Sequence, residues 1–382
     1  MSYLALYRKY RPKNFEEVIG QKHIVTSLKN QIINDQISHA YLFTGTRGTG
    51  KTSIAKIFAR AINCEKPNNG SPCGECPTCK ALLDPSSLDI IEIDAASNNR
   101  VDEIRDLREK VKYPPVNGRY KVYIVDEVHM LTDSAFNALL KTLEEPPKHV
   151  VFVLATTEVQ KLPATILSRC LRFDFKLLEN SEIEGLLHHI FEDSNIKYDK
   201  ESASLIARLG EGSVRDALSV AEMCVAYTNK NITYDAVIDA VGAIDRKVLN
   251  NLAGYVLSGD VNNILSTVDK ILEKGKVVSQ LAKDLANYFR DVAVAKTCKD
   301  ANNILKYPAD IFADMEVLAK ENSINKILNA FKTLSSLDNE FRYSTNPRSL
   351  FELNILNLTL ENQVDLESRV KVLEDKISKV LP

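Results

Sequence analysis

The sequence lacks any long run of apolar residues. None approaches the roughly 18 consecutive apolar residues that a membrane span requires, so an integral membrane protein is excluded. The first apolar stretch is interrupted by Arg8 and Lys9, which leaves no room for the apolar core of a secretory signal. We therefore expect a cytoplasmic protein that does not contact a membrane.

The sequence also has little net charge and no repetitive segment. It contains 49 Lys+Arg and 51 Asp+Glu, a formal net charge of −2. This balance argues against a protein whose whole surface coats nucleic acid, although it allows a local basic face. Apolar residues make up 45% and charged residues 26%, as in globular proteins. A length of 382 residues suggests two or three domains.

Cysteine is scarce outside one short segment. The count of seven is odd and no export signal is present, so a disulfide scaffold is not expected. Four cysteines lie between positions 64 and 79 and suggest a metal site. We expect Cys170, Cys224 and Cys298 to be buried apolar thiols.

The first part of the chain alternates short β-rich runs with stretches of helical periodicity. Several of the runs are almost continuously apolar, as in strands that helices cover on both faces. The predicted strands are 40–44, 88–93, 121–125, 150–155 and 171–175, and helical spacing follows at 101–111 and 134–143. Strand–helix alternation predicts a parallel α/β sheet within a domain at 1–178.

Beyond residue 178 the strand pattern fades and helical patterns follow. A small helical domain is expected at 179–242, and a second all-helical domain at 243–361, because Gly242 interrupts the periodicity. The main predicted helices are 181–192, 200–209, 213–228, 234–241, 278–296 and 324–337. The tail, 362–382, has heptad spacing over only two heptads, which favours an amphipathic helix that docks on its own domain or a neighbour over a coiled coil.

A phosphate-binding pattern follows the first predicted strand. Residues 45–52 read GTRGTGKT and match G-x-x-x-x-G-K-[ST] between a strand and a helix. Glycines let the backbone N–H groups surround phosphate oxygens, and the helix N-terminus adds a positive dipole end. A chance glycine-rich turn would not have this context. Lys51 is placed for the β- and γ-phosphates and Thr52 for Mg²⁺. The candidate nucleotide-binding residues are Gly45, Thr46, Arg47, Gly48, Thr49, Gly50, Lys51 and Thr52.

Polar residues end two other predicted strands. Asp126 and Glu127 follow an apolar strand, and the carboxyl ends of parallel strands are where ligands bind in α/β sheets. Asp126 can hold Mg²⁺ through water and Glu127 can polarise an attacking water. Solvated loop acids are the alternative. Thr156 and Thr157 end the next strand, where a hydroxyl could contact the γ-phosphate or that water.

Two arginines are further candidates. Arg215 lies near the start of a helix whose apolar stripe faces away from it, so it can reach a phosphate or form a surface salt bridge. Arg169 precedes the last strand and could supply the positive charge of an arginine finger, to its own nucleotide or to that of a neighbour.

The four clustered cysteines lie in a loop with too few apolar residues for a core of its own. Cys64, Cys73, Cys76 and Cys79 could surround one Zn²⁺ in a closed tetrahedral site, which is structural because no position remains for substrate. An iron–sulfur cluster is the competing interpretation. The Cys-x2-Cys spacings favour zinc.

Together these motifs resemble one family, the gamma/tau subunits of the bacterial DNA polymerase III clamp loader, which are AAA+ ATPases. The resemblance covers residues 1 to about 360. It rests on YRKYRP (7–12), HAYLFTGTRGTGKTS (39–53), the cysteine insert, EIDAASNN (92–99), VYIVDEVHML (122–131), LATTE (154–158), SRC (168–170) and GSVRDAL (212–218).

The resemblance implies roles that spacing alone does not give. Asp126 and Glu127 resemble the Walker B pair and Thr157 resembles sensor 1. Arg215 resembles sensor 2, and Arg169 resembles the finger that is presented to ATP on the adjacent subunit. Tyr7, Arg11 and Pro12 resemble the wall beside the adenine, Ser53 ends the matching P-loop stretch, and the four cysteines resemble the zinc site.

The resemblance also implies partners and a reaction. Family members form a pentameric ring with delta and delta-prime subunits, held together by a helical collar, which here would be 243–361. The region 179–242 would be the lid. ATP binding prepares the ring to open the sliding clamp, and primer–template DNA triggers hydrolysis. Arg100, Arg105 and Lys141 are candidates to face DNA, or alternatively part of a solvated helical face.

Two other functions remain possible from the sequence. One is a different AAA+ DNA motor, such as a branch-migration helicase, against which the cysteine insert counts. The other is a structural ring subunit without hydrolysis, against which Lys51, Asp126 and Glu127 count. No paired-carboxylate polymerase site is visible, so the chain is not expected to synthesise DNA itself.

Overall fold

A computed structural model describes residues 5–84, 87–97, 106–107, 109–273, 275–305 and 307–363. They fall into two units that are described separately below. The first is drawn from Met1–Tyr198 and Ala203–Asn231, and the second from Asp199–Ser202 and Ile232–Pro382. None of the helices in the described ranges combines the length and hydropathy of a membrane span.

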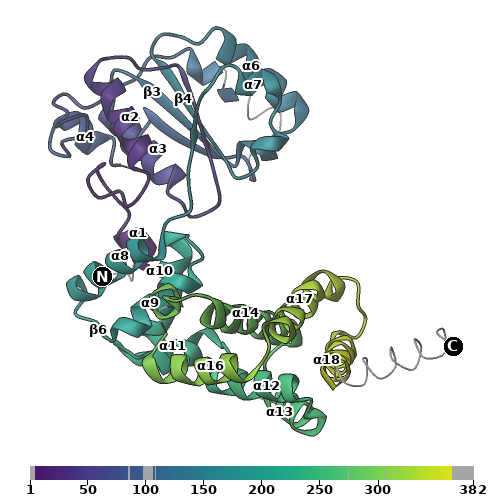
Figure 1. The fold of residues 1–382 in the computed structure, drawn as a ribbon. Helices are drawn as coiled ribbons and strands as arrows, with labels where there is room; N and C mark the ends of the chain where they lie inside the picture. Colours follow the sequence, from purple (N-terminus) through teal and green to yellow (C-terminus); the bar gives the residue numbers. More distant parts are fainter. Residues whose placement is uncertain are drawn as a thin grey trace. The chain divides into compact units, whose positions relative to one another are not determined.

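The first unit contains a five-stranded parallel sheet (Figure 1). Its strands are β1 (Ala40–Thr44), β2 (Ile90–Asp94), β3 (Lys121–Asp126), β4 (Val150–Thr156) and β5 (Leu171–Asp174). Their order in the sheet is β2-β3-β4-β1-β5. The predicted parallel sheet is confirmed, with strand ends that differ by one or two residues. This order brings the carboxyl ends of β3, β4 and β1 side by side.

Helices cover both faces of this sheet, as the continuous apolar runs in the strands predict. On one face Tyr41 and Phe43 of β1 pack with side chains of α2 (Lys22–Ile33) and α3 (Lys51–Ala61). On the other face, Leu42 packs with α6 (Asp133–Glu144) and α7 (Ala164–Leu167). The central strands are therefore buried along their length, and they hold the loops at their ends in fixed positions.

The remaining elements of the first unit are short, apart from two helices that follow the sheet. They are α1 (Leu6–Lys9), α4 (Pro77–Ala81), the 3-10 helices η1 (Val128–Met130) and η2 (Val159–Lys161), α8 (Asn180–Asp193), β6 (Lys197–Tyr198) and α10 (Val214–Thr228). At the start of α10 the Ser213 hydroxyl accepts a hydrogen bond from the Asp216 N–H at 3.2 Å, which caps the helix. α9 (Lys200–Leu209) and β7 (Asn231–Ile232) lie where the two units divide.

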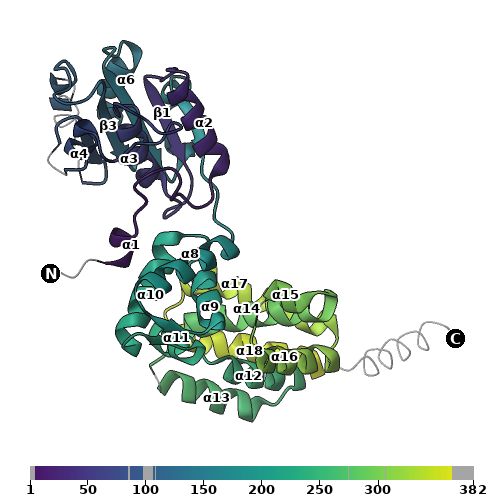
Figure 2. The same cartoon turned by 90° about the vertical axis from the view of Figure 1, so that its left-hand side faces the viewer.

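The second unit is helical in its described part. Its helices are α11 (Tyr234–Val241), α12 (Arg246–Ser258), α13 (Val261–Glu273), α14 (Val278–Thr297), α15 (Ala301–Leu305), α16 (Ala309–Glu321), α17 (Ile324–Phe341) and α18 (Pro347–Gln363). α14 lies beside α17 and α16 (Figure 2) and buries Leu281, Leu285 and Phe289 among them. Gly242 ends α11 with a φ of 67°, consistent with the predicted break there.

Some expectations from the sequence lie outside the described residues or are wrong. The tail beyond residue 363 lies outside them, as do Arg100, Arg105 and most of the helix expected at 101–111. Cys224 is buried and Cys170 is half-buried, but Cys298 is exposed just after α14. The expectation of a buried thiol is therefore wrong for Cys298, which falls past the apolar stripe that buries the rest of that helix.

Candidate functional site

The phosphate-binding loop joins β1 to α3, as the sequence pattern predicts. Gly45 has a φ of 141°, and a Cβ there would lie 2.5 Å from the Phe175 carbonyl oxygen. Gly50 has a φ of 101°, which a side chain would strain even though the space beside it is open. The loop thus requires glycine for close approach at one end and for its backbone conformation at the other. Thr46 and Arg47 at its tip are exposed.

Lys51 begins α3 and its side chain lies under the loop. Its Nζ donates to the Gly45 carbonyl at 2.6 Å and to the Thr46 carbonyl at 2.8 Å. Burial lowers the pKa of Lys51, and the nearby charges of Glu127 and Asp126 oppose this shift. The ammonium group is therefore held inside the loop and close to both acids.

Asp126 connects the end of β3 to the start of α3. Its Oδ2 accepts a hydrogen bond from the Thr52 hydroxyl at 2.7 Å, and its Oδ1 accepts one from the Glu127 N–H at 3.0 Å. The two residues predicted to hold Mg²⁺ are thus in direct contact. A carboxylate beside a hydroxyl is an oxygen donor set that suits Mg²⁺, which commonly keeps several of its waters.

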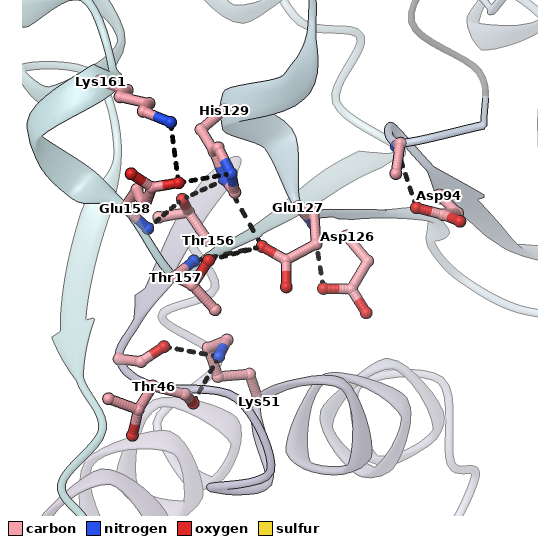
Figure 3. A network of polar contacts seen from close by, with 12 residues as sticks. Thr46, Lys51, Asp94, Asp126, Glu127, His129, Thr156, Thr157, Glu158 and Lys161 are labelled. Atoms are coloured by element: carbon pink, nitrogen blue, oxygen red, sulfur yellow. Dashed lines mark hydrogen bonds and ion pairs between the residues drawn. The ribbon is translucent and has the colours of Figure 1, made fainter. Parts of the chain in front are cut away.

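Glu127 and Thr157 meet between the ends of β3 and β4 (Figure 3). The Glu127 Oε2 accepts hydrogen bonds from the Thr157 hydroxyl at 3.0 Å and from the Thr157 N–H at 3.3 Å. Glu127 has a φ of 47°, a left-handed conformation that turns the chain sharply after the strand. The parallel sheet order thus places the acid pair, the threonine and the P-loop at one edge.

Arg215 and the N-terminal segment lie on another side of the loop. The Arg215 guanidinium is stacked 5.3 Å from the centre of the Tyr7 ring. Arg11 donates from Nε to the Ser53 hydroxyl at 3.1 Å, and Pro12 is half-buried beside it. These contacts join residues from three separate stretches of sequence, which spacing could not have predicted.

The start of α10 also approaches the P-loop closely. A Cβ on Gly48 would lie 1.8 Å from the Ser213 Oγ. The Leu178 N–H donates to the Gly212 carbonyl at 3.1 Å, which holds the preceding turn against the end of the sheet domain. Arg215 lies two residues after Ser213, the capping residue of α10, so the close approach of α10 also places Arg215 near the loop.

Arg169 forms its hydrogen bonds with residues of α6 and α7. Its Nη2 donates to Glu144 Oε1 at 2.8 Å, and its Nη1 donates to the Thr165 carbonyl at 2.9 Å. Among the residues that the structure describes, Arg169 has hydrogen-bond partners in Glu144, Thr165 and Ser168, and none in the P-loop. Lys141 is exposed on the same helix as Glu144.

The four clustered cysteines converge as a metal site requires. The sulfur atoms of Cys64, Cys73, Cys76 and Cys79 all lie within 4.8 Å of one another. Zn–S bonds of about 2.3 Å in a tetrahedron place sulfurs about 3.8 Å apart, and the Sγ atoms of Cys73 and Cys79 are 3.9 Å apart. The residues present therefore fit one zinc ion.

Backbone N–H groups point at these sulfurs. The N–H groups of Cys73, Cys76 and Cys79 donate to the sulfurs of Cys64, Cys73 and Cys76 at 3.3–3.4 Å. The N–H of Cys76 is the largest influence that lowers the pKa of Cys73, to about 6. Burial raises the pKa of Cys79. A nearby cation would favour the thiolate at each position.

Sequence reasoning missed several residues in contact with the predicted ones. His129 lies against Glu127 and also contacts Glu158. Tyr10 forms hydrogen bonds with Asp193 and Ser194 at the end of α8. His129 lies two residues after Glu127, so its closeness in sequence is a local signal that could have indicated it. The Tyr10 contacts join residues more than 180 positions apart and left no local signal.

Three family models together match most of the chain. Residues 20–179 match the model for the DNA polymerase III delta subunit, and 182–230 match that for the ATPase lid domain of DNA polymerase III clamp loader subunits. Residues 232–373 match the model for domain III of DNA polymerase III subunits gamma and tau. Structures of Thermotoga maritima RuvB, with 18% identity and a TM-score of 0.48 over 78% of this chain and 99% of theirs, are too distant to bear on function.

Curated relatives agree with these matches. DNA polymerase III subunit tau of Bacillus subtilis is 42% identical over 94% of this chain and 63% of its own length. The Escherichia coli tau subunit is 39% identical over 93% of this chain and 55% of its own length. The chain thus spans only about half to two thirds of these two relatives. DNA polymerase III subunit gamma of Buchnera aphidicola is 36% identical over 94% of this chain and 99% of its own length. The chain therefore belongs to the DNA polymerase III gamma/tau subunit family.

Proposed function

We propose that the chain is the ATP-hydrolysing subunit of the replicative sliding-clamp loader, which loads the clamp on primed DNA. The observation that supports this most strongly is the set of contacts at one sheet edge. The P-loop after β1, the acids after β3 and Thr157 after β4 meet there through hydrogen bonds. Phosphoryl transfer needs these groups together, because its catalysis consists mainly of positioning and electrostatic stabilisation.

Residues around the loop would hold ATP and Mg²⁺. The backbone of 45–52 and the N-terminus of α3 would bind phosphates, with Lys51 exchanging its bonds to loop carbonyls for phosphate oxygens. Thr52 and Asp126 would hold Mg²⁺, and Tyr7, Arg11 and Pro12 would border the adenine. Bound Mg²⁺ neutralises the charge that develops on the phosphates.

The remaining site residues would act on water and on charge. Glu127 would orient and polarise water, and Thr157 would fix the Glu127 carboxylate and sense the γ-phosphate. Arg215 would leave the Tyr7 ring for the phosphates. Arg169 would act on the nucleotide of an adjacent subunit, and its contacts with Glu144 and Thr165, away from the P-loop, support this.

The cysteine insert at 64–79 would hold a structural Zn²⁺. The insert is fixed to the rest of the unit by polar contacts, such as the Ser71 hydroxyl, which donates to Glu16 at 2.6 Å and accepts from the Phe15 N–H at 3.0 Å. Bound zinc cross-links four points of a loop that has little apolar core of its own.

The proposal extends to architecture and partners. The ATPase domain would span 1–178, the lid 179–242, the collar 243–361 and a helical tail 362–382. The partners would be delta and delta-prime subunits, further gamma/tau copies in a pentameric ring, the sliding clamp and primer–template DNA, all in the cytoplasm. Lys141 is exposed and would face DNA.

ATP hydrolysis by the assembled ring, with and without sliding clamp and primed template, tests this function. We expect weak hydrolysis by the isolated chain and a strong increase when partners, clamp and primed DNA are all present. An ATP hydrolysis rate that is the same with and without primed DNA would refute the proposed clamp-loading function. Stimulation by four-way DNA junctions, and not by primed template, would indicate a branch-migration motor instead.

A further inference from the structure

The His129 ring lies buried between two carboxylates at the end of the sheet (Figure 3). Its side chain is only 6% exposed, whereas those of Glu127 and Glu158 are 29% and 37% exposed. The ring Nδ1 lies 3.0 Å from the Thr156 hydroxyl and 3.4 Å from Glu127 Oε2, and Nε2 lies 3.3 Å from Glu158 Oε1. Both ring nitrogens therefore have polar partners on different elements.

The backbone fixes the ring in this place. Glu127 is in the left-handed region, and the Met130 N–H donates back to its carbonyl at 2.8 Å, which forms the turn of η1. Val128 is fully buried and anchors this turn in the core. The turn carries His129 across to the end of β4, where Thr156 is fully buried. His129 thus bridges two neighbouring strands of the sheet.

The same oxygen of Glu127 that faces His129 is held by Thr157. Oε2 of Glu127 has the Thr157 hydroxyl at 3.0 Å, the Thr157 N–H at 3.3 Å and the His129 Nδ1 at 3.4 Å. The other carboxylate oxygen is turned toward the P-loop side (Figure 3). A glutamate side chain has three rotatable bonds, and fixing one oxygen restricts where the other can point.

Glu158 completes the network from the far side. Its N–H donates to the Thr156 hydroxyl at 3.0 Å, and its carboxylate pairs with Lys161 at 2.8 Å. The hydrogen bond from Lys161 lowers the pKa of Glu158, and the charge of His129 adds a smaller contribution, so Glu158 stays anionic at neutral pH. The charged groups that face His129 are thus Glu127 and Glu158, with Lys161 behind Glu158.

We propose that His129 is a positioning residue for ATP hydrolysis: together with Thr157, it holds the Glu127 carboxylate so that its free oxygen faces the P-loop. This inference rests on the proposed ATPase function. No contact with the nucleotide is assigned to His129, since the contacts that carry the inference are those with Thr156, Glu127 and Glu158. Small displacements of a general base are costly, because water must lie within hydrogen-bond distance of both the base and its target.

Three substitutions separate positioning from packing. His129→Phe keeps the ring but removes both polar contacts. His129→Asn keeps a polar group at the position of Nδ1, next to Thr156 and Glu127. His129→Gln places the amide at the position of Nε2, next to Glu158. The exposed His189, changed to Phe, is the matched control on α8.

Steady-state ATP hydrolysis and nucleotide binding by the full chain in its assembled ring give the test. We expect His129→Phe to lower kcat on the order of 10-fold, with KM and the Kd of a nonhydrolysable ATP analogue within about twofold of wild type. His129→Asn should recover most of kcat, and His129→Gln should not. Equal losses in Asn and Phe, an unchanged kcat in Phe, or a loss confined to KM would overturn the proposal.

Further measurements distinguish a folding defect from a loss of positioning. If His129→Phe does not fold, as judged by its Tm, then Glu158→Gln decides, because this side chain is partly exposed and the substitution removes the negative charge that faces the ring Nε2. We expect a several-fold lower kcat at unchanged KM, and an unchanged kcat would refute the inference. Wild-type protein without ATP hydrolysis would instead refute the proposed function, whatever the variants do.

Discussion

At the scale of single residues, the two acids at the carboxyl end of β3, Asp126 and Glu127, are held by different partners. Asp126 accepts from Thr52 at the start of the P-loop helix, and Glu127 accepts from Thr157 at the end of β4. One acid is thus tied to the proposed metal side and the other to the proposed water side. Two adjacent residues of the same chemical type thus have different partners, and the chain turns at Glu127, which has a left-handed backbone conformation.

We expect Glu127→Gln to bind nucleotide with near-normal affinity but to hydrolyse it about 10²–10⁴ times more slowly, because the amide cannot accept a proton. Equilibrium binding and single-turnover hydrolysis measure the two effects separately. The control is Glu109→Gln, which changes an exposed glutamate that pairs with Lys112. Normal turnover in Glu127→Gln would remove Glu127 from the mechanism.

Gly48 gives a second prediction for a single residue. Its φ is 79°, and an added Cβ would overlap the Ser213 Oγ at the start of α10. Gly48→Ala should therefore push α10 and Arg215 away from the loop and weaken nucleotide binding by at least about tenfold. Adding Ser213→Gly removes the obstructing side chain at a cost of only a few tenths of a kcal/mol in helix capping. The double variant should bind better than Gly48→Ala, and equal binding would contradict the contact.

At the scale of elements, the four cysteines of the insert converge in a segment with few apolar residues. Its short helix α4 (Pro77–Ala81) is capped by Cys76, whose sulfur accepts the Cys79 N–H, so that one of the four cysteines also caps the helix. The sequence predicted that these four cysteines form one cluster, because tight Cys-x2-Cys spacing limits where the sulfurs can go. It could not predict how the insert docks on Phe15 and Glu16, which are distant along the chain.

Elemental analysis should find about one zinc per chain, and Cys76→Ser or a strong chelator should remove it. Each 1 kcal/mol lost from the free energy of unfolding lowers the Tm of a domain of this size by about 2–4 °C. We therefore expect loss of zinc to lower the Tm by roughly 5 °C or more. Cys298→Ser is the matched control, since this thiol is exposed and lies outside the cluster. Iron in place of zinc, or an unchanged Tm after zinc loss, would contradict a structural zinc site.

At the scale of the whole molecule, the sequence predicted the architecture better than the contacts between distant segments. The continuous apolar runs of β1, β3 and β4 and the P-loop pattern predicted a parallel sheet with a site at its edge, because both signals are local. The stacking of Arg215 on Tyr7 and the burial of His129 between Glu127 and Glu158 depend on tertiary packing. Periodicity carries no information about such pairs.

Arg169 belongs to this scale, because its proposed partner lies on another subunit. We expect Arg169→Ala to leave nucleotide binding by the chain unchanged and to lower the turnover of the assembled ring on the order of 10³-fold, as for other arginine fingers. Arg172→Ala, which removes an exposed arginine paired with Asp174 on β5, is the control. Loss of nucleotide binding in Arg169→Ala would show that Arg169 acts within its own chain.

The most direct measurement for the whole account is equilibrium titration of the chain with a nonhydrolysable ATP analogue and Mg²⁺. The wild-type chain should bind about one nucleotide. Lys51→Ala should lose most of that affinity, because Lys51 Nζ is the cation already held inside the loop. Absence of binding by the wild-type chain, or equal binding by Lys51→Ala, would contradict the claim that residues 45–52 form the nucleotide site.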